Sequence, residues 1–232
     1  MKDNNKTIVL LPGLNGTQNL FKPLVDKAPS NFNIITIAFP SQEHYSYQQL
    51  IQYVLEKISH LDGEFALLGE SFSGPLALFV AQTKPKNLMG IILVATFITA
   101  PTIQVARFLP WSFGFQLLKF ASSVFCRNQP ASVIGMVFSE LQTLEPKILA
   151  ERVQSIFTVD AKAALRDRSA PIVYFRGKKD FVVPKKNINQ ILSIKRDVKV
   201  VEFNTDHFLL QSAPAEAWDA ISSFAGKVID NG

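Results

Sequence analysis

The sequence predicts an α/β fold with a mostly parallel sheet of six strands, or slightly more, and helices on both of its faces. Six short runs of apolar and β-branched residues alternate with longer segments whose apolar residues recur at helical spacing. Strands that are apolar along their whole length are typical of a parallel sheet buried on both faces. The chain of 232 residues, 47% of them hydrophobic and 19% charged, is long enough for one domain of this kind.

The strands and helices of this fold follow one another along the whole chain. The predicted strands are TIVLL (7–11), NIITIAF (33–39), FALLG (65–69), LMGIILVATF (88–97), PIVYFRG (171–177) and VKVVEF (198–203). The predicted helices between and after them are NLFKPLVDKA (19–28), YSYQQLIQYVLEKIS (45–59), GPLALFVAQT (74–83), PKKNINQILSI (184–194) and APAEAWDAISSFAGKVI (213–229).

About seventy residues separate the fourth predicted strand from the fifth, which is far too long for a loop in a compact domain. This segment, residues 98–170, contains helical patterns and no strand of its own. We therefore predict a helical cap at 98–170, inserted into a core that consists of residues 1–97 and 171–232.

The predicted cap is rich in aromatic residues, with seven Phe and one Trp. Most of them must pack within the cap and against the core, but a piece of this size cannot bury them all. The remainder would line a cleft, which favours an apolar substrate group over a sugar or a peptide. We expect Trp111, Phe113 and Phe115 to be among these substrate-binding residues.

Charge and cysteine content narrow the class of protein further. The net charge of +5 does not come from a block of basic residues interleaved with aromatic ones, so nucleic-acid binding is not predicted. A single cysteine, Cys126, excludes an internal disulfide framework and gives no support for a cysteine-based metal site. The apolar run near the N-terminus is too short for a signal peptide, and no run reaches the ~18 apolar residues of a membrane span. We expect a cytoplasmic protein without a metal or a cofactor.

The candidate nucleophile is Ser71, in the hexapeptide GESFSG at 69–74 between a predicted strand and a predicted helix. A tight turn at this junction lifts a hydroxyl clear of the sheet, and it needs small residues two positions before and two after the serine. Gly69 and Ser73 satisfy this, although the usual pattern G-x-S-x-G has glycine at the last position. The alternative is that Ser71 only caps the helix.

A serine hydroxyl is a weak nucleophile and needs a base, which in turn needs an acid to orient it. The chain has three histidines, and two of them, His44 and His60, are expected on the surface. His207 follows the last strand and Asp180 follows the fifth, so both would lie at the carboxyl edge of the sheet beside Ser71. Asp206 adjoins His207 in the chain and is the weaker candidate, because adjacent side chains tend to point apart.

Acyl transfer also needs hydrogen-bond donors for the negative charge that develops on the carbonyl oxygen. One donor is expected to be the backbone N–H of Phe72, directly after the nucleophile. The second is expected from the turn after the first strand, in LLPGLNG (10–16), where we choose the N–H of Leu14. The alternative for this turn is a simple strand-to-helix connection.

The chain order of Ser71, Asp180 and His207, each after a strand, resembles that of the α/β-hydrolase superfamily over nearly the whole sequence. The matching motifs are LLPGLNGTQNLF, LLGESFSGPLAL, VYFRGKKDFVVP and DHFLLQSAPAEAWDAISSF. This resemblance implies an α/β-hydrolase fold with a cap after the fourth strand and no cofactor. It extends to small bacterial carboxylesterases and pimeloyl-carrier-protein methyl ester esterases, which implies an acidic acyl carrier protein as a further candidate partner.

The predicted function is a serine hydrolase that cleaves a small-molecule carboxylic ester or thioester with an apolar acyl group through an acyl-enzyme intermediate. Two alternatives from other classes stay open. One is a ligand receptor that retains the fold and turns over poorly. The other is a non-hydrolytic enzyme with the same residues, such as an acyltransferase or a lyase.

Overall fold

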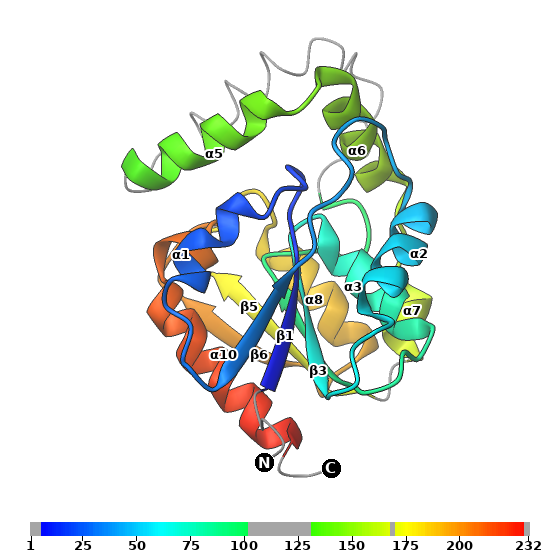
Figure 1. The fold of residues 1–232 in the computed structure, drawn as a ribbon, viewed down its shortest axis with the longest axis vertical. Coiled ribbons are helices and arrows are strands. Elements are labelled where there is room, and N and C mark those ends of the chain that lie inside the picture. The colour runs from blue at the N-terminus through cyan, green and yellow to red at the C-terminus, as the bar shows by residue number, and fades with distance from the viewer. Residues whose placement is uncertain (1–5, 102–130, 168–169, 230–232) are drawn as a thin grey trace.

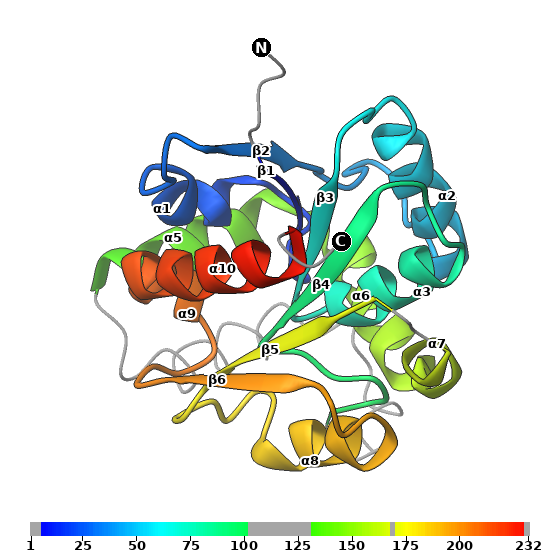
Figure 2. The ribbon, with the colours of Figure 1, turned by 90° about the horizontal axis from the view of Figure 1, so that it is seen from below.

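The chain folds around a six-stranded parallel sheet in the order β2-β1-β3-β4-β5-β6 (Figures 1 and 2). This computed structural model describes residues 6–101, 131–167 and 170–229. The strands are β1 (Lys6–Leu11), β2 (Phe32–Thr36), β3 (Phe65–Glu70), β4 (Leu88–Val94), β5 (Ile172–Gly177) and β6 (Lys199–Phe203). The predicted α/β class and the six parallel strands are therefore confirmed.

Helices cover both faces of the sheet (Figure 2). One face carries α2 (Tyr47–Ile58), α3 (Ser73–Gln82), α7 (Lys162–Arg166) and α8 (Lys185–Ile194). The other carries η1 (Asn19–Phe21), α1 (Lys22–Val25), α9 (Leu209–Ser212) and α10 (Pro214–Ile229). Along β1 the residues Val9 and Leu11 pack into the first layer, while Ile8 and Leu10 pack into the second. Burial on both faces explains why the strands are apolar along their whole length.

Helix α10 is fastened to the start of the chain through Trp218. Its indole ring packs against Phe32 with the ring centroids 5.1 Å apart, and its Nε1–H donates to the buried carbonyl oxygen of Leu24 at 2.6 Å. Since α1 precedes β2 and α10 is the last helix, this contact joins the two ends of the fold.

The segment between β4 and β5 leaves the core and returns to it at the same place, where its two ends are paired. Thr99 forms an antiparallel bridge with Asp160, and the N–H of Ala161 donates to the carbonyl oxygen of Ile98 at 2.8 Å. Between these points α5 (Ala131–Thr143) and α6 (Pro146–Thr158) lie over the carboxyl edge of the sheet (Figure 1).

Helix α7 follows the bridge between Thr99 and Asp160. It packs with α3 on the core through Ala164 and Leu165. Part of the segment predicted as a cap, 98–170, therefore belongs to the helical layer of the core. Trp111, Phe113 and Phe115 lie outside the described residues. In the part of the chain that the structure describes, every helix is too short or too polar to cross a lipid bilayer.

The Trp218 contact gives a first prediction. Trp218→Phe keeps an aromatic ring beside Phe32 but leaves the Leu24 carbonyl with only the backbone N–H of Lys27, at 3.2 Å, as a donor. The free energy of unfolding should therefore fall by about 0.5–1.5 kcal/mol. Urea denaturation measures the change. The matched control is Tyr53→Phe, which removes a hydroxyl that bonds Ala38 at an exposed position and should cost less, because water can replace it. Equal losses in the two variants would contradict this role of Trp218.

Candidate functional site

Ser71 occupies the turn between β3 and α3 with a strained backbone, at a φ of 49°. Non-glycine residues rarely adopt positive φ, and such strain is concentrated at functional sites. The turn is so tight that a Cβ on Gly69 would lie 2.9 Å from the carbonyl carbon of Ser73. Gly69 is therefore required, as the sequence pattern predicted, and Ser71 projects from the edge of the sheet.

The departure from G-x-S-x-G at Ser73 has a local explanation. Ser73 is fully buried, and its hydroxyl donates to the carbonyl oxygen of Pro12 at the end of β1. The extra atoms are thus accommodated by a hydrogen bond between the turn at Ser71 and the loop after β1. We call this loop, residues 12–18, the β1 loop.

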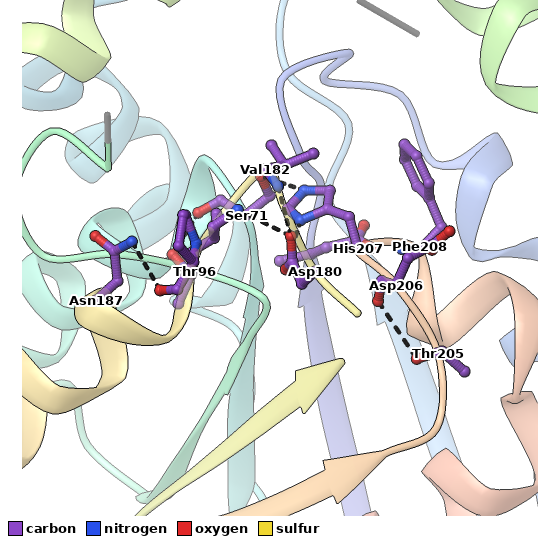
Figure 3. A network of polar contacts seen from close by, with 12 residues as sticks. Ser71, Thr96, Asp180, Val182, Asn187, Thr205, Asp206, His207 and Phe208 are labelled. Atoms are coloured by element: carbon purple, nitrogen blue, oxygen red, sulfur yellow. Dashed lines mark hydrogen bonds and ion pairs between the residues drawn. The ribbon is translucent and has the colours of Figure 1, made fainter. Parts of the chain in front are cut away.

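Ser71, His207 and Asp180 form one hydrogen-bonded series at the carboxyl edge of the sheet (Figure 3). The Ser71 Oγ lies 3.0 Å from His207 Nε2, and His207 Nδ1 lies 2.9 Å from Asp180 Oδ2. The other oxygen of Asp180 accepts the N–H groups of Val182 at 2.9 Å and Val183 at 2.8 Å, which fixes the carboxylate. The structure therefore brings together the three side chains that the sequence singled out.

Asp206 lies outside this series although it is also buried. Its Oδ1 accepts the backbone N–H of Phe208 at 3.2 Å, so its carboxylate holds the backbone after His207. Asp180, and not Asp206, is thus the carboxylate that contacts the His207 imidazole.

The protonation of His207 is governed by buried negative charge. Burial disfavours the protonated ring, but the charge and the hydrogen bond of Asp180, with further contributions from Glu70 and Asp206, outweigh burial and raise the pKa of His207 above its ordinary value. A raised pKa makes the imidazole a stronger base toward the Ser71 hydroxyl.

Two backbone N–H groups beside Ser71 make no hydrogen bond to another described residue, those of Leu14 and Phe72. The carbonyl of Phe72 accepts the hydroxyl of the partly buried Tyr47 at 2.9 Å, and the two rings stack with centroids 4.8 Å apart. The β1 loop lies close, since a Cβ on Gly13 would be 3.8 Å from the Cβ of Ser71. Both predicted donors therefore lie in segments next to Ser71, and neither has an acceptor among the described residues.

Sequence reasoning missed a hydrogen-bond network, formed by Tyr174 and Thr96, that holds the backbone of Ser71. The Tyr174 hydroxyl donates to the carbonyl oxygen of Thr96 at 2.6 Å and accepts its N–H at 2.9 Å, while the Thr96 hydroxyl donates to the carbonyl oxygen of Ser71. The strand predicted at 88–97 includes Thr96, so the bond from Thr96 to Ser71 was not expected. In the structure β4 ends at Val94 and the chain turns at Ala95 with a φ of 45°. Nothing in the apolar run marks that turn.

Glu70 was also missed. It is a buried carboxyl group next to the nucleophile, and Gln211 donates to it at 2.9 Å. Burial raises the pKa of Glu70, opposed by the Gln211 hydrogen bond and by His207. A glutamate in a turn between two apolar segments was the available signal.

His44, expected on the surface, is partly buried instead, with its Nε2 3.5 Å from Ser155 Oγ on α6.

This fold and the placement of Ser71, Asp180 and His207 at the edge of the sheet are those of an α/β-hydrolase. The model of the alpha/beta hydrolase family matches residues 8–220. The chain belongs to this family.

Solved structures agree with the fold over almost the whole chain. An esterase from Exiguobacterium antarcticum superposes with a TM-score of 0.83 at 16% identity, covering 96% of this chain and 92% of that chain. A hydrolase from Oleispira antarctica gives 0.83 at 12% identity, with 95% and 90% covered. A lipase-esterase related protein from Clostridium acetobutylicum gives 0.79 at 15% identity, with 96% of each chain covered. At 12–16% identity these neighbours establish the fold alone.

The charges around the histidines give a second prediction. His207 should titrate above the ordinary histidine pKa of 6.5, and His44 below it, because burial lowers the pKa of His44 and the raising effect of Glu151 does not offset it. NMR titration of the ring protons measures both, with His44→Gln and His207→Gln for assignment. Asp206→Asn removes a negative charge that favours the imidazolium, so the His207 midpoint should move to lower pH. A midpoint that stays in place would contradict this electrostatic coupling.

Proposed function

We propose that the chain is a serine hydrolase that cleaves a carboxylic ester or thioester with an apolar acyl group through an acyl-enzyme intermediate. The observation that supports this best is the continuous hydrogen-bonded series from Ser71 through His207 to Asp180, at a strained turn. The family membership and the esterase among the structural neighbours support the same reaction class.

In the proposed reaction Ser71 Oγ attacks the acyl carbonyl while His207 Nε2 takes its proton. Asp180 holds the imidazole in the tautomer that has its proton on Nδ1, and it stabilises the imidazolium that forms. The N–H groups of Leu14 and Phe72 receive the developing negative charge on the carbonyl oxygen. The imidazolium then protonates the leaving alcohol or thiol, and a water molecule, deprotonated by His207, releases the acid from Ser71.

The substrate class rests on the segment between β4 and β5, which we propose acts as a cap. Its helices α5 and α6 lie over the edge that carries Ser71 (Figure 1), and the segment is rich in phenylalanine. Such a cover would exclude water, which strengthens the interactions with the oxyanion. Trp111, Phe113 and Phe115 remain the proposed contacts to the acyl chain.

The third prediction tests the nucleophile. A fluorophosphonate should add one adduct to the chain, on the peptide that contains Ser71, and none to Ser71→Ala, as mass spectrometry of the digest would record.

Asp180→Asn should lower kcat by about 10⁴-fold because the imidazole is then held in the wrong tautomer. Asp206→Asn should cost far less. Labelling at another residue, or the reverse ranking of the two aspartates, would refute the assignment.

The fourth prediction tests the acyl group with p-nitrophenyl esters and the matching thioesters from acetyl to decanoyl. Each methylene buried contributes ~0.8 kcal/mol, so kcat/KM should rise about fourfold per methylene and then fall at a definite length. Phe113→Ala or Phe115→Ala should move that limit to longer chains if the residue forms the pocket floor. A flat profile would mean that the cap does not bind the acyl chain.

Repeating the assay with an alcohol acceptor separates a hydrolase from an acyltransferase, and absence of steady turnover would indicate a receptor.

A further inference from the structure

Arg152 is the most unusual charged residue outside the Ser71 series. It belongs to α6, is only 2% exposed, and donates to three backbone carbonyls of the core. Its Nη1 bonds the oxygens of Leu14 at 3.1 Å and Asn15 at 2.9 Å, and its Nη2 bonds the oxygen of Pro40 at 2.8 Å. An arginine of the segment between β4 and β5 is thus inserted into the β1 loop.

The burial of this charge needs an explanation beyond stability. Among the described residues no carboxylate lies within ion-pair distance of Arg152, and only backbone carbonyls and the face of Phe39, 5.8 Å from Arg152 Cζ, compensate it. Removing a cation from water without a counter-charge is costly. Burial lowers the pKa of Arg152 to about 10, so the guanidinium is still protonated at neutral pH. A neutral side chain would fasten α6 at lower cost.

The carbonyls that Arg152 bonds lead directly to the N–H of Leu14. The Asn15 carbonyl shares its peptide group with the N–H of Gly16. That N–H donates to the carbonyl of Gly13 at 3.0 Å, and the Gly13 carbonyl shares its peptide group with the N–H of Leu14. The intervening peptide group, between Leu14 and Asn15, is held by Arg152 as well. Three consecutive peptide groups are therefore fixed from one guanidinium.

Gly16 makes this approach possible. Its φ is +72°, and a Cβ at this position would lie 2.8 Å from Arg152 Cζ and closer still to Nη1. A side chain at residue 16 would strain the backbone and displace the guanidinium. The glycine of the sequence LNG thus has a specific partner on α6.

We propose that Arg152 is a positioning residue that orients and polarises the Leu14 N–H as an oxyanion donor. The guanidinium withdraws electron density from the Asn15 carbonyl, and hydrogen bonds in series polarise one another, so the positive charge is relayed through the Gly16 N–H and the Gly13 carbonyl to Leu14. This inference rests on the proposed acyl transfer at Ser71 and adds to it the residue that prepares one half of the oxyanion hole.

Glu140 offers a matched comparison on α5. It is buried and joins the same β1 loop by accepting from the Thr17 hydroxyl, and it also accepts from Asn19 Nδ2, at the start of η1, at 2.9 Å. These partners are side chains, so Glu140 fastens the loop to α5 without holding the peptide groups of residues 13–16. A residue that only fastens the loop should behave like Glu140.

The experiment compares Arg152→Met, Arg152→Lys and Glu140→Met with the wild type and with Arg166→Met, which replaces an exposed arginine of α7. Removal of a complete oxyanion donor typically costs 10²–10³-fold in kcat, so loss of its support should cost Arg152→Met about 10–100-fold. The acylation rate and the affinity for a trifluoromethyl ketone, whose adduct carries the oxyanion, should fall together. KM should change by no more than about twofold. The pH profile should keep its midpoint, because Arg152 does not contact His207.

Arg152→Lys retains the charge without the forked geometry and should lose less, which also tests the proposal if Arg152→Met does not fold. Glu140→Met should change kcat by less than about threefold, and Arg166→Met should match the wild type. An Arg152→Met variant that alters KM alone, that has wild-type ketone affinity, or that loses no more kcat than Glu140→Met would overturn the inference. Wild-type protein that neither reacts with a fluorophosphonate at Ser71 nor turns over an ester would instead reject the proposed function, whatever the variants do.

Discussion

The site depends on the tight turn between β3 and α3, which holds Ser71 at positive φ. Such strain persists only where the surroundings over-determine the backbone. Here the Ser71 N–H donates to the carbonyl of Val94 at 2.8 Å, the Ser71 carbonyl accepts the Thr96 hydroxyl, and the Ser73 hydroxyl reaches Pro12. These partners lie at the ends of β4 and β1, on either side of β3, so the parallel register of the sheet fixes the turn.

Buried negative charge is the second constraint. Three buried carboxyl groups lie near His207, those of Asp180, Asp206 and Glu70. The sheet brings them together because its strands end at one edge. Only Asp180 bonds the imidazole directly, and the other two act on it through their charge. The basicity of His207 is therefore a property of the whole edge, while its orientation depends on one contact.

The sequence predicted the strands, and singled out the three side chains of the Ser71 series, for the same reason. Strands buried on both faces are apolar throughout, and a polar residue directly after such a strand, as at Ser71, Asp180 and His207, stands out from its neighbours. Where a strand ends within an apolar run this contrast is absent, so β4 was predicted three residues too long, to Phe97, and the role of Thr96 was hidden. Arg152 could not be predicted, because one arginine in an amphipathic helix resembles a solvated one until the helix is placed.

The contacts of Arg152 bear on how the segment between β4 and β5 acts on the proposed chemistry, whereas Glu140 only fastens α5 to the β1 loop. Both residues are buried and reach the β1 loop from different helices, and their charges have opposite sign. A shift of α6 relative to the sheet would therefore change the peptide groups around Leu14 as well as the space above Ser71. In the proposed reaction, substrate binding by this segment and stabilisation of the oxyanion would then be mechanically linked. An acyl group that seats the segment correctly would improve both, which is how binding energy remote from the reacting bond can raise kcat rather than only lower KM.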